Sequence, residues 1–151
     1  MRDAVIEAIA HSALYKPTAK LFASLAVLRQ LTAAISETTD FRAYGVRIAI
    51  EAIWNIIEVG GQEAIQSMAT EEEIVRTIKR TFERVMRNGY KLDDKCLRNE
   101  LIILANYIAT CPESHQFFVG SKAVYSNGPE PAEGELCLLE TMLYYATHDE
   151  L

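Results

Sequence analysis

Apolar side chains recur at three- and four-residue steps along most of the chain, and this spacing predicts helices. No segment alternates strictly between apolar and polar residues, so we expect no β-sheet. Glycine, proline and serine gather at 120–134, which predicts a loop. The pattern therefore predicts an all-α fold, with helices at about 2–15, 17–36, 41–59, 71–87, 93–110 and 135–147, and shorter helical turns at about 62–68 and 110–119.

Residues with known preferences for helix ends support several of these boundaries. Pro17 suits the first turn of the second helix, and Gly60-Gly61 is expected to stop the third. Thr70 and Glu73 have the spacing of a capping box, in which each side chain bonds to the other residue's amide. Asp93 is expected to cap the helix that follows Asn88-Gly89.

Two of the expected helices, 43–59 and 93–110, are apolar around nearly their whole circumference. Such a helix must be covered on more than one side. In a chain of 151 residues, this favours a stack of helix layers, with each apolar helix between two neighbours. The helix at 71–87 is instead amphipathic, and its apolar face consists of Ile74, Val75, Ile78, Phe82 and Val85.

Residues 51–65 and 102–118 resemble each other, because each is an apolar helix with one central asparagine, then a break and a second apolar run. Helical units that recur at several tens of residues are typical of a solenoid. An unpaired amide inside an apolar helix is costly, so Asn55 and Asn106 are expected to bond. They either clamp one layer to the next or bind the backbone of a partner.

Composition narrows the function further. The formal net charge is −6, which argues against nucleic-acid binding. Three cysteines without a CxxC motif fit reduced thiols. The N-terminus lacks the pattern of a signal peptide, and no run approaches the roughly 20 apolar residues of a membrane span. We therefore expect a single cytoplasmic helical domain with no membrane or nucleic-acid partner.

No catalytic motif is present in the sequence. It contains no G-x-S-x-G motif, no P-loop and no G-x-G-x-x-G motif. Cys111 and His115 lie four residues apart, but a metal site needs more ligands than these two. The alternative is a packed thiol beside a surface imidazole. We expect no catalytic residue, no metal and no cofactor, and hence no enzyme.

The strongest candidate binding surface is basic. Arg76, Arg80, Arg84 and Arg87 follow steps of four, four and three residues, which place them in one sector of the helix at 71–87. This arginine stripe would suit an acidic protein segment. The alternative is a solvated face held by ion pairs such as Glu72–Arg76, Glu73–Arg76 and Glu83–Arg87.

The segments AIWNIIEVGGQEAI and LRNELIILANYIATCPESHQFFV resemble armadillo-type repeats. The resemblance implies an α-solenoid with two repeats over about 40–119 and partial repeats at both ends. In peptide-binding members the central asparagines hold the ligand backbone, which corresponds here to Asn55 and Asn106. Those members carry a tryptophan four residues earlier, where this chain has Glu51 and Ile102.

Residues 91–100 are similar to a narrower group of armadillo-like scaffolds from the central apparatus of the ciliary axoneme. This resemblance implies a ciliary location, axonemal partner proteins and a chain that is a segment of a longer protein. We therefore expect a non-catalytic protein–protein interaction scaffold. The alternative is a regulatory helical domain that binds a small ligand or peptide in its core or groove, which a closed apolar cavity with convergent polar groups would indicate.

Overall fold

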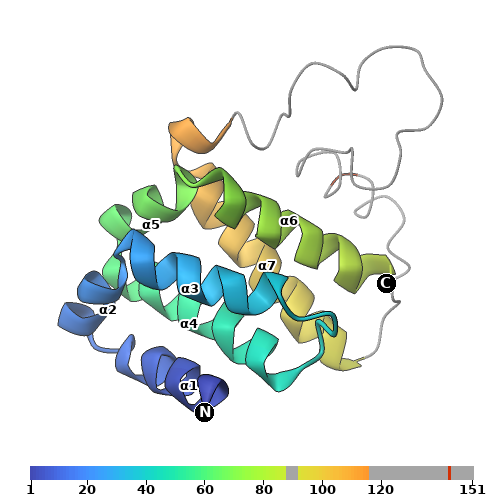
Figure 1. The fold of residues 1–151 in the computed structure, drawn as a ribbon. Coiled ribbons are helices and arrows are strands. Elements are labelled where there is room, and N and C mark those ends of the chain that lie inside the picture. The colour runs from blue at the N-terminus through green and yellow to red at the C-terminus, as the bar shows by residue number, and fades with distance from the viewer. Residues whose placement is uncertain (88–91, 116–142, 144–151) are drawn as a thin grey trace.

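The computed structural model describes residues 1–87, 92–115 and 143 (Figure 1). Within those ranges there is no β-strand, which confirms the all-α prediction. The elements are α1 (Arg2–Ser12), α2 (Lys16–Phe22), α3 (Leu25–Ser36), α4 (Tyr44–Gly60), α5 (Gln62–Ala69), α6 (Glu72–Arg87), α7 (Leu92–Ala109) and the 3₁₀ turn η1 (Pro112–Ser114).

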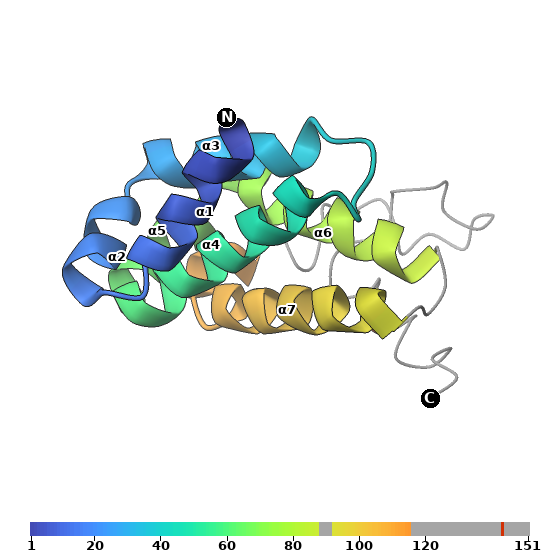
Figure 2. The ribbon, with the colours of Figure 1, turned by 90° about the horizontal axis from the view of Figure 1, so that it is seen from below.

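The long helices form two layers. One layer contains α1, α4 and α7, which run in the same direction, and α4 contacts the other two (Figures 1 and 2). The second layer contains α3 and α6, which run side by side in the opposite direction. Helix α3 packs on α4, and α6 packs on α7. A short helix, a helix of intermediate length and a long helix follow one another twice along the chain. The first occurrence is α2, α3 and α4, and the second is α5, α6 and α7.

Helix α4 is the most enclosed element of the stack. Ten of its residues are buried, and each fully buried isoleucine contributes about 1.5–3 kcal/mol relative to an exposed one. The prediction of neighbours on two sides is confirmed for this helix. Its buried residues are Gly45, Val46, Ile48, Ala49, Ile50, Ala52, Ile53, Ile56, Ile57 and Gly60.

Small residues allow α1 to lie close to α4. A Cβ atom at Gly45 would lie 2.7 Å from Asp3 Oδ1, and Ala10 and Ala13 of the α1 segment are buried. At the other end of α4, Gly61 takes a φ of 75°. This left-handed conformation suits glycine and stops the helix at the expected place.

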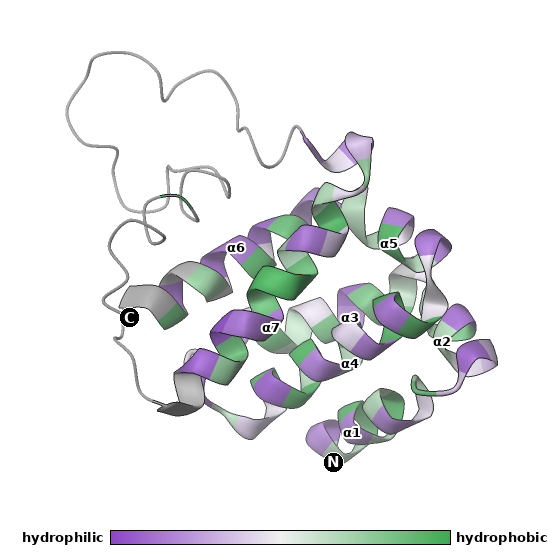
Figure 3. Ribbon diagram, turned by 180° about the vertical axis from the view of Figure 1, so that it is seen from behind, coloured by the Kyte–Doolittle hydropathy of each residue, from purple (hydrophilic) through white to green (hydrophobic). Residues whose placement is uncertain are grey.

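The amphipathic pattern of α6 is confirmed. Its five predicted apolar side chains are all buried, and Figure 3 shows polar positions beside them on the same helix. They pack toward α3 and α7, which are the principal neighbours of α6.

The prediction of one helix over 17–36 is wrong, because the segment forms α2 and α3. Ser24 has an extended backbone, with φ −62° and ψ 141°, and the chain bends by 74° between the two helices. The bend lets both apolar segments contact α4 from different directions. No single helix among the described residues is long and apolar enough for a membrane span, although this bent pair reaches that length and composition across its break.

The predicted capping box at Thr70 and Glu73 is also wrong. The Thr70 hydroxyl donates to the carbonyl oxygen of Gln66 at 3.0 Å, so it serves the end of α5. The start of α6 is formed by Glu71, whose carbonyl accepts from the amides of Ile74 and Val75. Only two residues separate α5 from α6, so Thr70 belongs to the last turn of the earlier helix.

Other expected ends lie near their predicted places or outside the described residues. Helix α1 ends at Ser12 and not at residue 15, because the amides of Leu14 and Tyr15 each donate to the carbonyl oxygen three residues earlier and so close its last turn. The predicted turn at 110–119 begins as η1. Its remainder, the stop at 88–89, the loop at 120–134 and the helix at 135–147 lie outside the described residues.

Candidate partner-binding surfaces

The first two members of the arginine stripe are exposed and paired within their own helix. Arg76 pairs with Glu72, as the helical spacing predicts. Arg80 Nη1 lies 3.9 Å from Glu73 Oε1. Surface pairs of this kind contribute about 0–1 kcal/mol. Both guanidinium groups can therefore exchange these carboxylates for those of a partner at little cost.

The third member has a different position. Arg84 is half-buried, and its Nη1 and Nη2 atoms each lie 3.4 Å from a carbonyl oxygen of the α3–α4 loop, at Thr38 and Thr39. It therefore links α6 to that loop. The Arg87 backbone ends α6, and its side chain lies outside the described residues.

An ion pair that the sequence did not indicate joins the two helices of the second layer. Both Nε and Nη2 of Arg29 donate to Glu71 Oε2, at 3.1 and 2.9 Å. The residues are 42 positions apart, so no helical spacing could have revealed the contact. The pair holds the start of α6 against α3.

Asn55 connects two helices of the first layer. Its side chain is half-buried, and Nδ2 donates to the Ala10 carbonyl oxygen at 3.1 Å. This carbonyl lies in the last turn of α1, where the Leu14 amide bonds to His11 instead. Asn55 therefore satisfies an acceptor that the end of a helix leaves open. This bond clamps two helices of the same layer, whereas we expected from the sequence a clamp from one layer to the next, and a role of Asn55 in partner binding stays a prediction.

Asn106 does not repeat this arrangement. It is exposed on α7, and its side chain makes no hydrogen bond with the described residues. Its amide is available to solvent or to a partner. The two asparagines thus share a sequence pattern but have different surroundings, and Asn106 also stays a predicted binding residue.

Acidic side chains from three helices lie near one another on the first layer. A hydrogen bond with Glu7 raises the pKa of Tyr44, and burial and the charges of Glu7, Glu51 and Asp3 raise it further. Burial raises the pKa of Glu100 on α7, and the charge of Glu51 on α4 adds to that increase, while Arg47 opposes it. Sequence reasoning missed this grouping because its members lie on separate helices.

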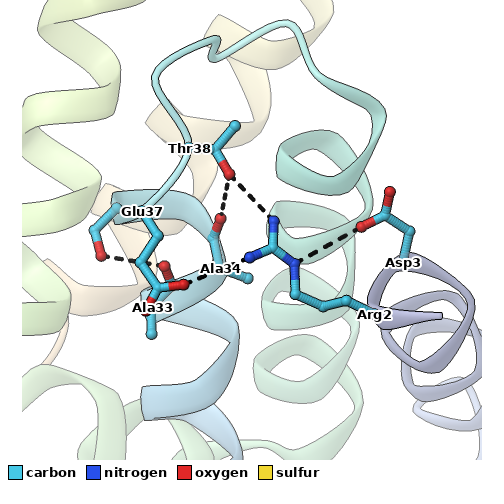
Figure 4. A network of polar contacts seen from close by, with 7 residues as sticks. Arg2, Asp3, Ala33, Ala34, Glu37 and Thr38 are labelled. Carbon is cyan, nitrogen blue, oxygen red and sulfur yellow. Dashed lines mark hydrogen bonds and ion pairs between the residues drawn. The ribbon is translucent and has the colours of Figure 1, made fainter.

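An apolar groove runs between α1 and α3. It has a volume of about 490 Å³, and we call it the α1–α3 groove. At one end, Arg2 bridges the two helices by contacting Glu37 and Thr38, and it also lies near Asp3 (Figure 4). The groove is lined by Arg2, Val5, Ile6 and Ile9 of α1, by Ala26, Val27, Gln30, Leu31, Ala33 and Ala34 of α3, and by Glu37.

Cys111 and His115 are not arranged as metal ligands. Cys111 Sγ donates to Glu113 Oε2 at 2.9 Å, and this bond and burial raise the pKa of the thiol. The His115 Nε2 atom lies 2.9 Å from the Ala109 carbonyl oxygen. A raised pKa disfavours the reactive thiolate. Across 1–87 and 92–115, no group of three or more histidine, cysteine, aspartate or glutamate residues could hold a metal ion.

Comparison with known proteins extends these observations. Residues 22–123 match the family model described as cilia- and flagella-associated protein 69, ARM repeat. The chain is 28% identical over 64 residues to cilia- and flagella-associated protein 69 of Callithrix jacchus, and 27% identical to the Homo sapiens protein over the same length. Those 64 residues are 42% of this chain and 7% of each relative, so the chain matches only a small part of these proteins. No solved structure matches the chain.

The family match covers α3 to η1, so it includes both occurrences of the short, middle and long helix order except for α2, of which only Phe22 is matched. It confirms the armadillo-type resemblance and the narrower similarity to cilia- and flagella-associated protein 69. Since more than half of the 151 residues are matched, the chain belongs to the family of the cilia- and flagella-associated protein 69 ARM repeat.

Proposed function

We propose that the chain is a non-catalytic scaffold segment that binds proteins of the ciliary axoneme, within the cytoplasmic space of the cilium. The observation that carries this proposal is the stacked arrangement of the helices. The helices are parallel within each of the two layers, and the layers enclose a packed interior and present a wide outer surface. Extended surfaces built in this way are typical of binding proteins. Family membership supports the ciliary assignment.

We place the partner-binding surface on the exposed part of the arginine stripe, at Arg76 and Arg80. Their side chains are 47% and 59% exposed, and they project from a helix whose other face is buried. An acidic protein segment would compete with Glu72 and Glu73 for these guanidinium groups, which suit carboxylates through their forked geometry. Arg84 supports this surface by linking α6 to the α3–α4 loop, and Asn55, Asn106 and Arg87 are additional candidate contacts.

Binding to isolated axonemes tests the proposal. The purified chain is mixed with demembranated axonemes, and the bound fraction is measured by co-sedimentation over a range of chain concentrations. The test variant is Arg76→Glu/Arg80→Glu. The matched control is Lys16→Glu/Lys20→Glu, which makes the same charge change at the same spacing on exposed positions of α2.

We expect saturable binding by the wild type and the control. The arginine variant should bind about tenfold more weakly, which corresponds to about 1.4 kcal/mol, and added salt should weaken wild-type binding because exposed charges are screened. Equal binding by both double variants would remove the stripe from the account. Absence of saturable binding by the wild type would contradict the scaffold function itself.

The alternative of a small ligand is favoured by one observation, the size of the α1–α3 groove, which falls in the range of ligand pockets. Its polar groups do not converge on an empty centre, however, because Arg2 is engaged by Glu37 and Thr38. Val5 is 55% exposed in the groove, so the site is open to solvent. These features fit an extended apolar occupant better than an enclosed small molecule.

A further inference from the structure

The α1–α3 groove lies at a place where the pattern of the stack is interrupted. Helices α4 and α7 each carry an antiparallel helix of the second layer, namely α3 and α6. Helix α1 belongs to the same layer as α4 and α7, but within the described residues no second-layer helix packs on it in this way. The groove occupies the corresponding position, with α1 as one wall and α3 as the other.

The neighbouring interface shows what fits such a position. Helix α6 packs on α7 and beside α3, and it buries an apolar stripe at Ile74, Ile78, Phe82 and Val85. A helix in the groove would make the same two kinds of contact, with α1 in place of α7 and with the opposite side of α3. The groove therefore continues an interface that already exists one step along the stack.

From this continuity, we infer that the α1–α3 groove is a docking site for an amphipathic helix of a partner polypeptide, packed antiparallel to α1. The inference deepens the proposed scaffold function, on which it rests for the kind of partner. The wall from Ala26 to Glu37 spans 12 residues, or about 17 Å of helix, which accommodates about three turns of the partner.

The lining defines the chemistry of the occupant. Val5, Ile9 and Val27 require an apolar stripe with the three- and four-residue spacing of α6. An occupant parallel to α3 would end near Arg2, which is 54% exposed there. If the guanidinium group exchanges its exposed contacts with Glu37 and Thr38, it complements the last carbonyl groups of a helix and the negative end of its dipole. We therefore expect an occupant with an apolar stripe and an uncapped C-terminal turn.

A peptide titration of the full chain tests this inference without axonemes. The probe is a fluorescein-labelled synthetic peptide with the sequence of residues 71–87, chosen because α6 occupies the corresponding position one step along the stack. Binding is followed by fluorescence anisotropy. The test variant Val5→Glu places a charge in the groove. The matched control Ala4→Glu places the same charge on an exposed position of α1 that does not line it.

We expect saturable binding to the wild-type chain and to Ala4→Glu, and at least about tenfold weaker binding to Val5→Glu, which is about 1.4 kcal/mol. A peptide with aspartate in place of Ile78 should not bind. Circular dichroism of each variant confirms that a loss of binding does not arise from unfolding. Because this assay contains no axonemes, its result is independent of the test at Arg76 and Arg80.

Several outcomes would overturn the inference. Absence of saturable binding by the folded chain, or equal binding by the two glutamate variants, would exclude the groove as a helix site. Self-association of the chain that Val5→Glu abolishes, measured by analytical ultracentrifugation, would assign the groove to a second copy. Peptide binding that appears only in the full chain carrying Leu138→Asp/Leu139→Asp would assign it to the chain's own C-terminal segment.

Discussion

Helices α4 and α1 belong to the same layer and run in the same direction, but they differ in how many neighbours cover them. Helix α4 lies between α1 and α7 and also carries α2 and α3, and most of its circumference is buried. Helix α1 buries Ile6 and Ala10, while Val5 remains 55% exposed. The comparison teaches that the apolar fraction of a helix circumference reports the number of its neighbours.

The largest effect that follows from this comparison is expected in the centre of α4. Ile53→Ala should reduce the free energy of unfolding by about 2–5 kcal/mol, because it opens a cavity among side chains that cannot fully collapse. Val5→Ala on α1 should change it by less than about 0.5 kcal/mol. Urea denaturation of the two variants measures both values, and equal losses would contradict the difference between the helices.

The clamp between the two helices should have the next largest effect. Asn55→Ala leaves the Ala10 carbonyl without its donor and should destabilise the chain by about 1–3 kcal/mol. Asn106→Ala is the control, since that side chain is exposed and should contribute less than about 0.5 kcal/mol. Thermal and urea unfolding report the difference. A comparable loss in the control would show that α7 uses its asparagine in the same way.

The arginine stripe should divide into a structural and a surface part. Arg84→Ala removes the link to Thr38 and Thr39 and should lower stability by about 1 kcal/mol. Arg80→Ala should leave it within about 0.5 kcal/mol, because it breaks only an exposed pair. The same unfolding measurement checks both. Greater destabilisation by Arg80→Ala than by Arg84→Ala would contradict the assignment of the structural contact to Arg84.

The smallest expected effect is a change of stability with pH, which Glu100 causes where α7 contacts α4. Burial raises the pKa of Glu100 above its ordinary value of 4.5, so the folded chain binds more protons than the unfolded chain in that range. Stability from this group is therefore present below the ordinary value and is lost as pH rises through the raised pKa. Glu100→Gln removes the loss and should be more stable than the wild type at neutral pH.

Urea unfolding of wild type and Glu100→Gln over a series of pH values checks this prediction. The stability difference between the two chains should be smallest at the acidic end, where Glu100 is protonated in both states, and should grow toward neutral pH. Glu51→Gln should reduce the difference, because the Glu51 charge contributes to the increase of the pKa. A variant that is less stable than the wild type at neutral pH would contradict the expected sign.

Much of the fold could be predicted because local signals and packing agree in α4, α6 and α7. The apolar pattern of α6 predicted its buried face, and Gly61 predicted the end of α4. The break at Ser24 could not be predicted, because its cause is the packing of α2 and α3 on different parts of α4. Thr70 was assigned to the wrong helix because its spacing to Glu73 also fits a capping box.

The candidate sites were less predictable for the same reason. The helical spacing of Arg76, Arg80 and Arg84 placed them on one face, but only the fold shows that Arg84 reaches the α3–α4 loop. Repeated sequence also did not reveal that Asn55 and Asn106 have different neighbours. The α1–α3 groove is formed by two helices that contact each other little, so neither helix alone indicates it.

The central claim is that α4 is covered on both sides within the stack, whereas α1 and α3 leave a docking groove between them. Native-state amide hydrogen exchange of the full chain, resolved by residue, tests it most directly. Amides in the middle of α4 should exchange only through global unfolding, and those of α1 should exchange through local opening with a smaller free energy. Equal protection of α1 and α4 would contradict the claim, because both helices would then be equally enclosed.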